Sequence, residues 1–392
     1  MWLLITFLVY PAKDNHGTHA QTHIQINNPS VEHTFGEQII FRAEIPSSAN
    51  IDQIQLVFTP EGFKNSIVIP VNISINNRLL ARYQLKPQEN ILPFSTITYQ
   101  YMVTLTTDDQ AVSDLFSFQY DDNLHRWETL EGANLFKVHW YDGDLAFGRA
   151  ILDAAMNTLD RFKKYLILPN PENLDIYVYA SPSELQEILD LTEYPWIAGH
   201  AAPENNMVLV SITPGALQLL EIERQIPHEI THLRLYQYFG DRYDNIPTWL
   251  DEGIASLAEA FPNSDYKFIL SGGYENETLI SFKSLCESFP PTASEINLAY
   301  AQSDSFVRFI YNEYGSNGLQ NLLDAYKQGY SCEKGPSEVF GINLRQLERL
   351  WYQDTFGEAQ PLMANELLGW SILCIIVLIT PTTAIILTAR RK

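Results

Sequence analysis

The chain has 392 residues, enough for two or three domains, and its 46% hydrophobic and 12% aromatic content is ample for packed cores. Its 25 basic and 47 acidic residues give a formal net charge of −22. This balance argues against a nucleic-acid partner, because phosphate binding requires clustered Lys and Arg.

The N-terminus predicts a signal peptide over residues 1–20. Residues 2–9 are apolar over about the length of the hydrophobic part of such a peptide, and a cleavage site could follow Ala20. No basic residue precedes the apolar run, in contrast to a typical signal peptide. We therefore expect the domains that follow to be exported.

Residues 21–122 predict an all-β domain. Apolar residues alternate across residues 67–75 and 97–105, as in strands with one buried face. Shorter runs follow the same pattern at 39–45, 54–58, 79–85 and 115–120. Short strands separated by turn residues are typical of an immunoglobulin-like sandwich. We expect a spacer or docking module, with a specific ligand-binding role as the alternative.

Beyond a boundary near residues 121–130 the pattern changes to mixed α and β. Apolar residues at helical spacing predict a long helix near 145–167. A capping box with proline at the first helical position begins another helix at residues 181–184. Strands are predicted at residues 174–179 and 207–212.

The segment His-Glu-Ile-Thr-His at residues 228–232 is the most informative part of the chain. Histidines four residues apart lie on one face of a helix, one turn from each other. Pro227 suits the first turn of that helix, and Gly240 is a natural end for it. A short loop and a second, antiparallel helix over residues 248–260 would bring Glu252 back beside the histidines.

These residues have the chemistry of a metal-dependent hydrolase. Two neutral imidazoles, from His228 and His232, and the Glu252 carboxylate leave a tetrahedral Zn²⁺ with an open position for water. Glu229 can act as general base on that water. We therefore predict a zinc peptidase with about one ion per chain. A serine hydrolase does not compete, because the chain has no G-x-S-x-G motif.

The histidine motif, followed by Trp-Leu-Asp-Glu-Gly-Ile-Ala at residues 249–255, resembles the glutamate-zincins (gluzincins) and is most similar to the peptidase-MA-like bacterial proteins. The resemblance covers roughly residues 127–352, within a predicted α+β zincin-like metallopeptidase domain at 123–358. It implies four functional residues, the zinc ligands His228, His232 and Glu252 and the catalytic base Glu229.

One position departs from the pattern that the resemblance implies. Many gluzincins have an acid four residues after the glutamate ligand, which holds a ligand histidine in its tautomer, and Ser256 stands at that position here. Asp251 and Glu259 are nearby alternatives for this role. Zincins often place a Tyr or His over the metal to stabilise the oxyanion, and Tyr300 is the candidate, with a packing role as the alternative.

The resemblance also suggests how substrate binds. In gluzincins the edge strand corresponding to residues 207–212 pairs with an extended substrate. Backbone hydrogen bonds then give affinity that does not depend on the sequence of the substrate. Residues 201–205 are weakly similar to the element with which zinc aminopeptidases hold a free amine. Glu204 is therefore a candidate amine ligand, with a plain loop carboxylate as the alternative.

A helix is predicted at residues 297–314, ended by Gly315, and another at 318–328, ended by Gly329. A third is predicted at residues 343–356, begun by an Asn343 cap. Cys286 and Cys332 both fall in the predicted exported domain and could pair; whether they do is left open.

The C-terminus predicts a membrane anchor. After a linker at residues 359–366, residues 367–387 carry no charge and are long enough to span a bilayer. The basic tail at 388–392 then lies in the cytoplasm and the preceding domains lie outside. A buried core helix is the alternative.

Together these features predict a single-pass protein of the cell membrane. Its expected function is zinc-dependent hydrolysis of peptide or protein substrates outside the cell, with a Glu general base. Two alternatives stay open: a catalytically inactive zincin-like binding or adhesion protein, and an aminopeptidase rather than an endopeptidase.

Overall fold

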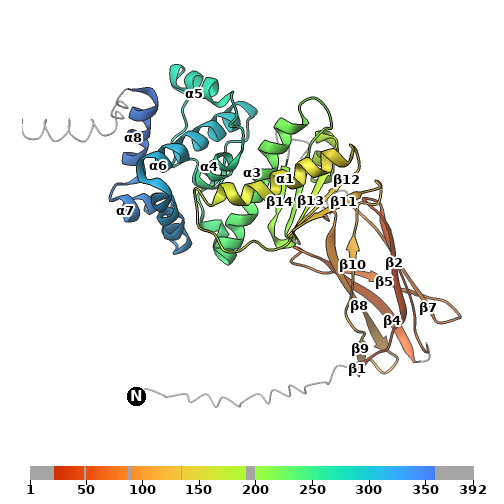
Figure 1. Ribbon diagram of the computed structural model, residues 1–392. Helices are drawn as coiled ribbons and strands as arrows, with labels where there is room; N and C mark the ends of the chain where they lie inside the picture. Colours follow the sequence, from red (N-terminus) through yellow and green to blue (C-terminus); the bar gives the residue numbers. More distant parts are fainter. Residues whose placement is uncertain (1–21, 48–49, 87–90, 134, 191–198, 358–392) are drawn as a thin grey trace, which may run out of the picture. The chain divides into compact units, whose positions relative to one another are not determined.

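The computed structural model describes residues 22–47, 50–86, 91–133, 135–190 and 199–357. They form two compact units, one with the residues up to Trp127 and with 183–190, the other with 128–182 and 199–357 (Figure 1). The predicted signal peptide and membrane span lie outside the described residues. Within the described ranges, none of the helices combines the length and apolar character that crossing a bilayer requires.

The first unit is built from two β-sheets whose buried side chains form one core. All pairs are antiparallel except the short pair of β1 and β9. The larger sheet contains β1 (Thr22–His23), β9 (Gln110–Val112), β8 (Ser95–Leu105), β4 (Ile51–Pro60) and β5 (Ile67–Pro70), with β10 (Phe116–Tyr120) paired to β8. The smaller contains β2 (Asn27–Thr34), β3 (Gln38–Glu44), β7 (Arg78–Gln84) and β6 (Asn72–Ile73). The N-terminal region is therefore sheet-rich, as predicted.

The alternating run over residues 67–75 predicts one strand, but it forms two. β5 pairs with β4 in the larger sheet, whereas β6 pairs with β7 in the smaller one, so the chain changes sheets after Pro70. Proline lacks the N–H needed to continue a ladder. Ile73 and Ile75, which the alternation predicts to be buried, are consequently exposed.

The second unit begins with a five-stranded sheet, in which the inner pairs are parallel and both outer pairs antiparallel. Its order is β11 (Glu128–Gly132), β12 (Phe136–Trp140), β13 (Leu174–Tyr179), β15 (Met207–Ser211) and β14 (Gly199–Ala202). α1 (Leu145–Phe162) and α3 (Gln218–Phe239) lie against this sheet (Figure 1), and their apolar side chains are buried in one core with those of the strands. β13 and β15 match the predicted strands, whereas β11, β12 and β14 are additional.

α3 begins at Gln218, earlier than predicted, so Pro227 lies inside the helix rather than in its first turn. Proline cannot donate to the carbonyl four residues before it, which is that of Glu223. That carbonyl instead accepts the N–H of Ala260 at 3.0 Å. The carbonyl that Pro227 leaves without a donor thus binds the segment after α4 (Thr248–Ala258) to α3. Gly240 ends α3 with a φ of 59°, as expected.

A second core in this unit joins α4 and the end of α3 to the helices that follow. These are α5 (Tyr266–Glu275), α6 (Ala293–Lys327), α7 (Gly335–Phe340) and α8 (Leu344–Phe356). The two helices predicted on either side of Gly315 appear as α6, with a non-helical break at that glycine, where φ is 68°. Asn343 caps α8 as predicted. α2 (Pro182–Ile188) begins at the proline of the predicted capping box, and all of it but Pro182 belongs to the first unit.

Candidate metal centre

α3 and α4 bring the two histidines and Glu252 together. The rings of His228 and His232 lie one turn apart on α3, with centroids 5.0 Å from each other. Glu252 Oε2, on α4, is 3.2 Å from His228 Nε2 and 3.6 Å from His232 Nε2. The three residues predicted to be ligands therefore face a common point: His228 and His232 each present an imidazole nitrogen to it, and Glu252 presents a carboxylate oxygen.

The spacing of these atoms fits zinc. Ligand bonds of about 2.1 Å in a tetrahedron place the ligand atoms about 3.4 Å apart. The separations of 3.2 and 3.6 Å lie on either side of that value. Glu252 Oε2 is also buried without a well-aligned hydrogen-bond donor among the described residues. A buried carboxylate oxygen facing two imidazole nitrogens is a suitable donor set for Zn²⁺.

The other nitrogen of each histidine is held by a second carboxylate. His228 Nδ1 lies 3.0 Å from Glu259 Oε1, and His232 Nδ1 lies 3.2 Å from Asp251 Oδ1. When Nδ1–H donates to a carboxylate, the lone pair of Nε2 is left to face the metal. Both alternatives to Ser256 are thus used, one for each histidine.

These carboxylates have partners of their own. Tyr243 donates its hydroxyl to Asp251 Oδ2 at 2.8 Å. Arg224 Nε lies 3.8 Å from Glu259 Oε2. Glu259 directly follows α4 and precedes Ala260, the residue bound to α3. The orientation of the imidazoles is therefore supported by a layer of residues beyond the carboxylates.

The electrostatic field at this point favours positive charge. Burial lowers the pKa of His228, but the adjacent Glu252 and Glu259 outweigh it and raise the pKa to about 10. Burial also lowers the pKa of His232, but the charges of Asp251 and Glu252 outweigh this effect and raise the pKa well above its usual value. Burial raises the pKa of Glu252, yet the charges of both histidines leave it lowered. The same carboxylates would stabilise a divalent cation.

Glu229 projects from α3 against the edge strand β14. A Cβ atom placed on Gly199 would lie 2.4 Å from Glu229 Oε1, so only glycine allows this close approach. Burial raises the pKa of Glu229, against the opposing charges of the two histidines. β15 lies inside the sheet between β13 and β14, so the expectation that residues 207–212 form the substrate-pairing strand is wrong. Among the described residues β15 is the sole partner of β14, and no described strand lies on the other edge of β14.

Two further predicted residues have different surroundings. The Tyr300 ring, on α6, has its centroid 6.4 Å from that of His228. The charge of Glu252 and burial raise the pKa of Tyr300 well above its usual value, so the residue keeps a hydroxyl proton to donate. Glu204 lies in a 3-10 turn (Pro203–Asn205) and is exposed. Within the part of the chain that the structure describes, it is not a member of the histidine–glutamate cluster.

Several residues of the site escape prediction from sequence. Tyr243 and Arg224 act through the carboxylates and belong to no motif. Gly199 lies in a four-residue strand with no usable periodicity. His200 follows it, and burial together with the charge of His232 lowers its pKa. A glycine in a short strand is a weak signal of close backbone approach.

Comparison with known proteins gives one family. A family model described as the peptidase MA superfamily matches residues 154–356. Aminopeptidase M1-B of Oryza sativa subsp. japonica is 26% identical in an alignment 277 residues long, which covers 63% of this chain and 28% of that protein. The chain thus spans less than a third of the length of that relative.

Two solved structures that match this chain are remote likenesses. Purple acid phosphatase PPD1 from yellow lupin (Lupinus luteus) seeds aligns with 48% of this chain and 35% of its own, at 8% identity and a TM-score of 0.22. Cwp6 from Clostridium difficile aligns with 64% and 48%, at 13% identity and a TM-score of 0.20. Such low scores carry no argument about fold or activity.

Proposed function

Because the chain belongs to the peptidase MA superfamily as a gluzincin-like member, we propose that it is a zinc-dependent peptidase. The observation that carries the proposal is the convergence of His228 Nε2, His232 Nε2 and Glu252 Oε2, with both Nδ1 atoms held by carboxylates. If these three residues served only to stabilise the fold, two imidazole nitrogens would not need to face a buried carboxylate oxygen that accepts no well-aligned hydrogen bond.

The chain's own residues supply the remaining chemistry. Zinc, when bound, acts as a Lewis acid that acidifies water and polarises a carbonyl. Glu229 takes a proton from the attacking water and delivers it to the leaving amine. The Tyr300 hydroxyl donates a hydrogen bond to the oxygen on which negative charge develops. Asp251 and Glu259 fix the two ligand histidines in one tautomer.

The substrate class follows from the edge strand. The edge of β14 on which no described strand lies, in the strand that Glu229 approaches at Gly199, can bind an extended peptide through backbone hydrogen bonds. Recognition through the backbone favours peptide or protein substrates of varied sequence. Gly199 brings this edge close to the catalytic carboxylate.

Two substitutions test the assignment of roles. Glu229→Gln keeps the size of the side chain but removes the base, so it should retain zinc and lose nearly all turnover. Glu252→Ala removes a ligand and should lose zinc. Metal content by elemental analysis and hydrolysis of a quenched unstructured protein measure the two properties. Full activity of Glu229→Gln would disprove the mechanism.

An aminopeptidase is the second candidate, favoured by the likeness to aminopeptidase M1-B. Glu204, the candidate amine ligand, is exposed, and its position gives the aminopeptidase proposal no support. Comparing hydrolysis of free and N-acetylated peptides separates the two activities, because an aminopeptidase needs the free amine. Zinc binding without hydrolysis of any peptide would instead favour the inactive adhesion protein.

We also propose the cellular setting from the sequence. The apolar segment 367–387 and the basic tail after it support a single membrane anchor, with the peptidase unit outside the cell. The sandwich of the first unit, for which an immunoglobulin-like topology is proposed, would serve as a spacer or docking module. Surface labelling of intact cells tests this orientation.

A further inference from the structure

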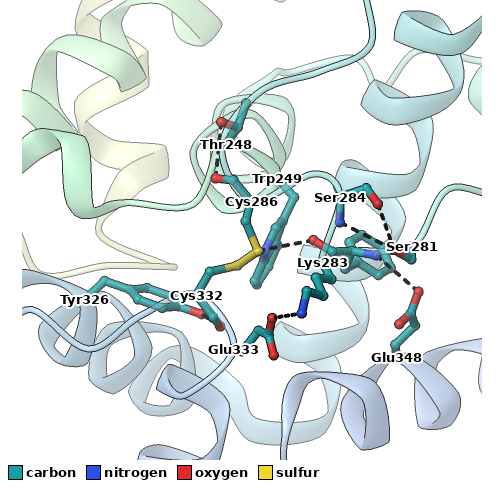
Figure 2. The surroundings of a disulfide bond; sticks show 11 residues. Thr248, Trp249, Ser281, Lys283, Ser284, Cys286, Tyr326, Cys332, Glu333 and Glu348 are labelled. Atoms are coloured by element: carbon teal, nitrogen blue, oxygen red, sulfur yellow. Dashed lines mark hydrogen bonds and ion pairs between the residues drawn. A yellow bond between two sulfur atoms is a disulfide. The ribbon is translucent and has the colours of Figure 1, made fainter.

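A disulfide joins Cys286 to Cys332, which are 46 residues apart in the sequence. Figure 2 shows the two cysteines and their surroundings. In the sequence, Cys286 lies in the segment between α5 and α6, and Cys332 lies between α6 and α7. Neither cysteine belongs to the metal centre. The pairing settles a question that the sequence leaves open.

The segment that ends at Cys286 caps the start of α4. The first N–H groups of a helix have no partner within it, and α4 has no side-chain cap. Here the N–H of Thr248 donates to the Cys286 carbonyl at 3.0 Å, and that of Trp249 donates to the Leu285 carbonyl at 3.1 Å. The position of the first turn of α4 therefore depends on residues 285 and 286.

The other half of the disulfide contacts the same turn. Trp249 is fully buried, and its indole Nε1 lies 3.3 Å from Cys332 Sγ (Figure 2). The disulfide thus holds two segments against the start of α4, one through backbone carbonyls and the other through the tryptophan ring.

Two residues of the metal centre follow immediately on this helix. Asp251 orients His232, and Glu252 faces both imidazoles. Displacing the first turn of α4 would move both carboxylates together, and displacements of about 1 Å are enough to impair a site that depends on fixed geometry.

Among the described residues, the polar link between the two segments is a single surface ion pair. Lys283 and Glu333 form an ion pair across them, but both side chains are more than half exposed, and such pairs contribute little. A cavity of about 730 Å³, lined in part by Lys283, Cys286, Cys332 and Glu333, opens beside the disulfide. The segments therefore have room to separate once the covalent bond is lost.

We propose that the Cys286–Cys332 disulfide is a positioning element of the metal centre, which sets the place of Asp251 and Glu252 through the start of α4. This inference rests on the proposed zinc-peptidase function. The disulfide makes zinc binding sensitive to the redox state: a phosphine reductant and water would convert it to two thiols and a phosphine oxide, and the metal centre would loosen.

The double variant Cys286→Ser/Cys332→Ser of the full chain tests the proposal directly. Serine keeps an acceptor near the Trp249 indole while removing the covalent bond. We expect zinc affinity, measured by competition with a chelator, to fall about tenfold, the scale seen when residues supporting metal ligands are changed. The control is Ser305→Ala, which removes the acceptor of the Trp351 indole in the same core and should lower thermal stability without lowering zinc affinity.

A second variant keeps the disulfide and removes one capping bond. Proline is well tolerated at the first helical position, where it lacks only the N–H. Thr248→Pro therefore deletes the N–H bond to the Cys286 carbonyl, together with the longer bond of 3.4 Å that the Thr248 hydroxyl donates to the same oxygen, and should weaken zinc binding several-fold. Thr248→Ala deletes the hydroxyl bond alone and keeps the N–H, so it should bind zinc nearly as the wild type does, and the pair of variants isolates the N–H bond.

The outcomes separate this inference from the proposed function. Zinc binding by the wild type, weakened in the double variant and in Thr248→Pro but not in the two controls, supports the positioning role. Equal zinc affinity of the wild type and the folded double variant, or of the wild type and Thr248→Pro if the double variant does not fold, overturns this inference alone. No zinc binding by the folded wild type overturns the proposed function, and the inference with it.

Discussion

At the scale of single residues, the centre depends on carboxylates that bind no metal themselves. Glu259 reaches His228 from beyond the end of α4, where its position is fixed by the bond between Ala260 and the Glu223 carbonyl. Asp251 reaches His232 from the first turn. Each ligand histidine is therefore oriented by a different end of the same helix.

Glu259→Gln should weaken the centre without dismantling it. The amide oxygen can still accept a hydrogen bond from His228, but the charge that raises the basicity of the ligand is lost. We expect zinc affinity to fall about tenfold. Chelator competition measures it, with the exposed Glu275→Gln as a control for charge alone. Unchanged affinity would show that Glu259 does not orient the ligand.

Gly199→Ala should impair catalysis while sparing the metal. The new Cβ would meet Glu229 Oε1 at 2.4 Å, and the flexible carboxylate would have to move. We expect kcat/KM to fall at least about tenfold with zinc content unchanged, because a general base must stay within reach of its proton. Gly272→Ala, whose Cβ would meet nothing within 4 Å, is the matched control. Wild-type kcat/KM would contradict the placement of Glu229.

The convergence of His228, His232 and Glu252 could be predicted from sequence, but the residues around them could not. The spacing of His228 and His232 is encoded within one helical turn, and Glu252 follows a recognisable helix start. Glu259 and Tyr243 become neighbours of the histidines only when α3 and α4 pack together. Such neighbours depend on tertiary contacts, which no local pattern records.

At the scale of elements, α4 is attached at both ends. Its start is capped by carbonyls of the disulfide-bonded segment, and its end is bound to α3 through the carbonyl that Pro227 leaves without a donor. A proline inside a helix ordinarily costs about 3 kcal/mol or more. We attribute its presence here to the attachment of Ala260.

Pro227→Ala should therefore change stability and metal binding in opposite directions. Alanine restores an N–H that competes with Ala260 for the Glu223 carbonyl. We expect Tm to rise, since helix propensity improves, and zinc affinity to fall several-fold because Glu259 is released. Thermal unfolding of the metal-free chain and chelator competition measure the two effects. Higher stability with unchanged zinc affinity would show that Pro227 has no part in positioning Glu259.

Element boundaries were predictable where a residue has a strong local preference. Asn343 begins α8, and Gly240 ends α3, through capping interactions confined to a few residues. The start of α3 was predicted wrongly because Pro227 is tolerated inside the helix by a partner distant in sequence. Residues 67–75 formed two strands because each half pairs with a different sheet.

At the scale of the whole molecule, the helical core of the second unit is joined by covalent and buried polar links. Closing a loop of 46 residues by the disulfide removes entropy from the unfolded chain worth about 4 kcal/mol. Glu348 of α8 lies in the same core and accepts the N–H of Phe282 at 3.1 Å. Burial raises the pKa of this carboxyl group, against the opposing effects of that bond and of Arg345.

The raised pKa of Glu348 predicts a pH-dependent stability. A carboxyl group whose pKa is higher in the folded state contributes stability that is present below its unfolded pKa and lost as pH rises through the folded pKa. Glu348→Gln should therefore gain stability relative to the wild type as pH rises above the usual Glu range. Urea unfolding at several pH values gives the difference. A difference independent of pH would contradict the burial of an ionisable group here.

The central claim is that His228, His232 and Glu252 bind zinc for peptide hydrolysis. The most direct measurement is the metal content of the full chain by elemental analysis, together with cleavage of an unstructured protein before and after a chelator. We predict about one zinc ion per chain and cleavage that the chelator abolishes and added zinc restores. A folded chain that holds no zinc, or cleavage that persists after its removal, would contradict the account.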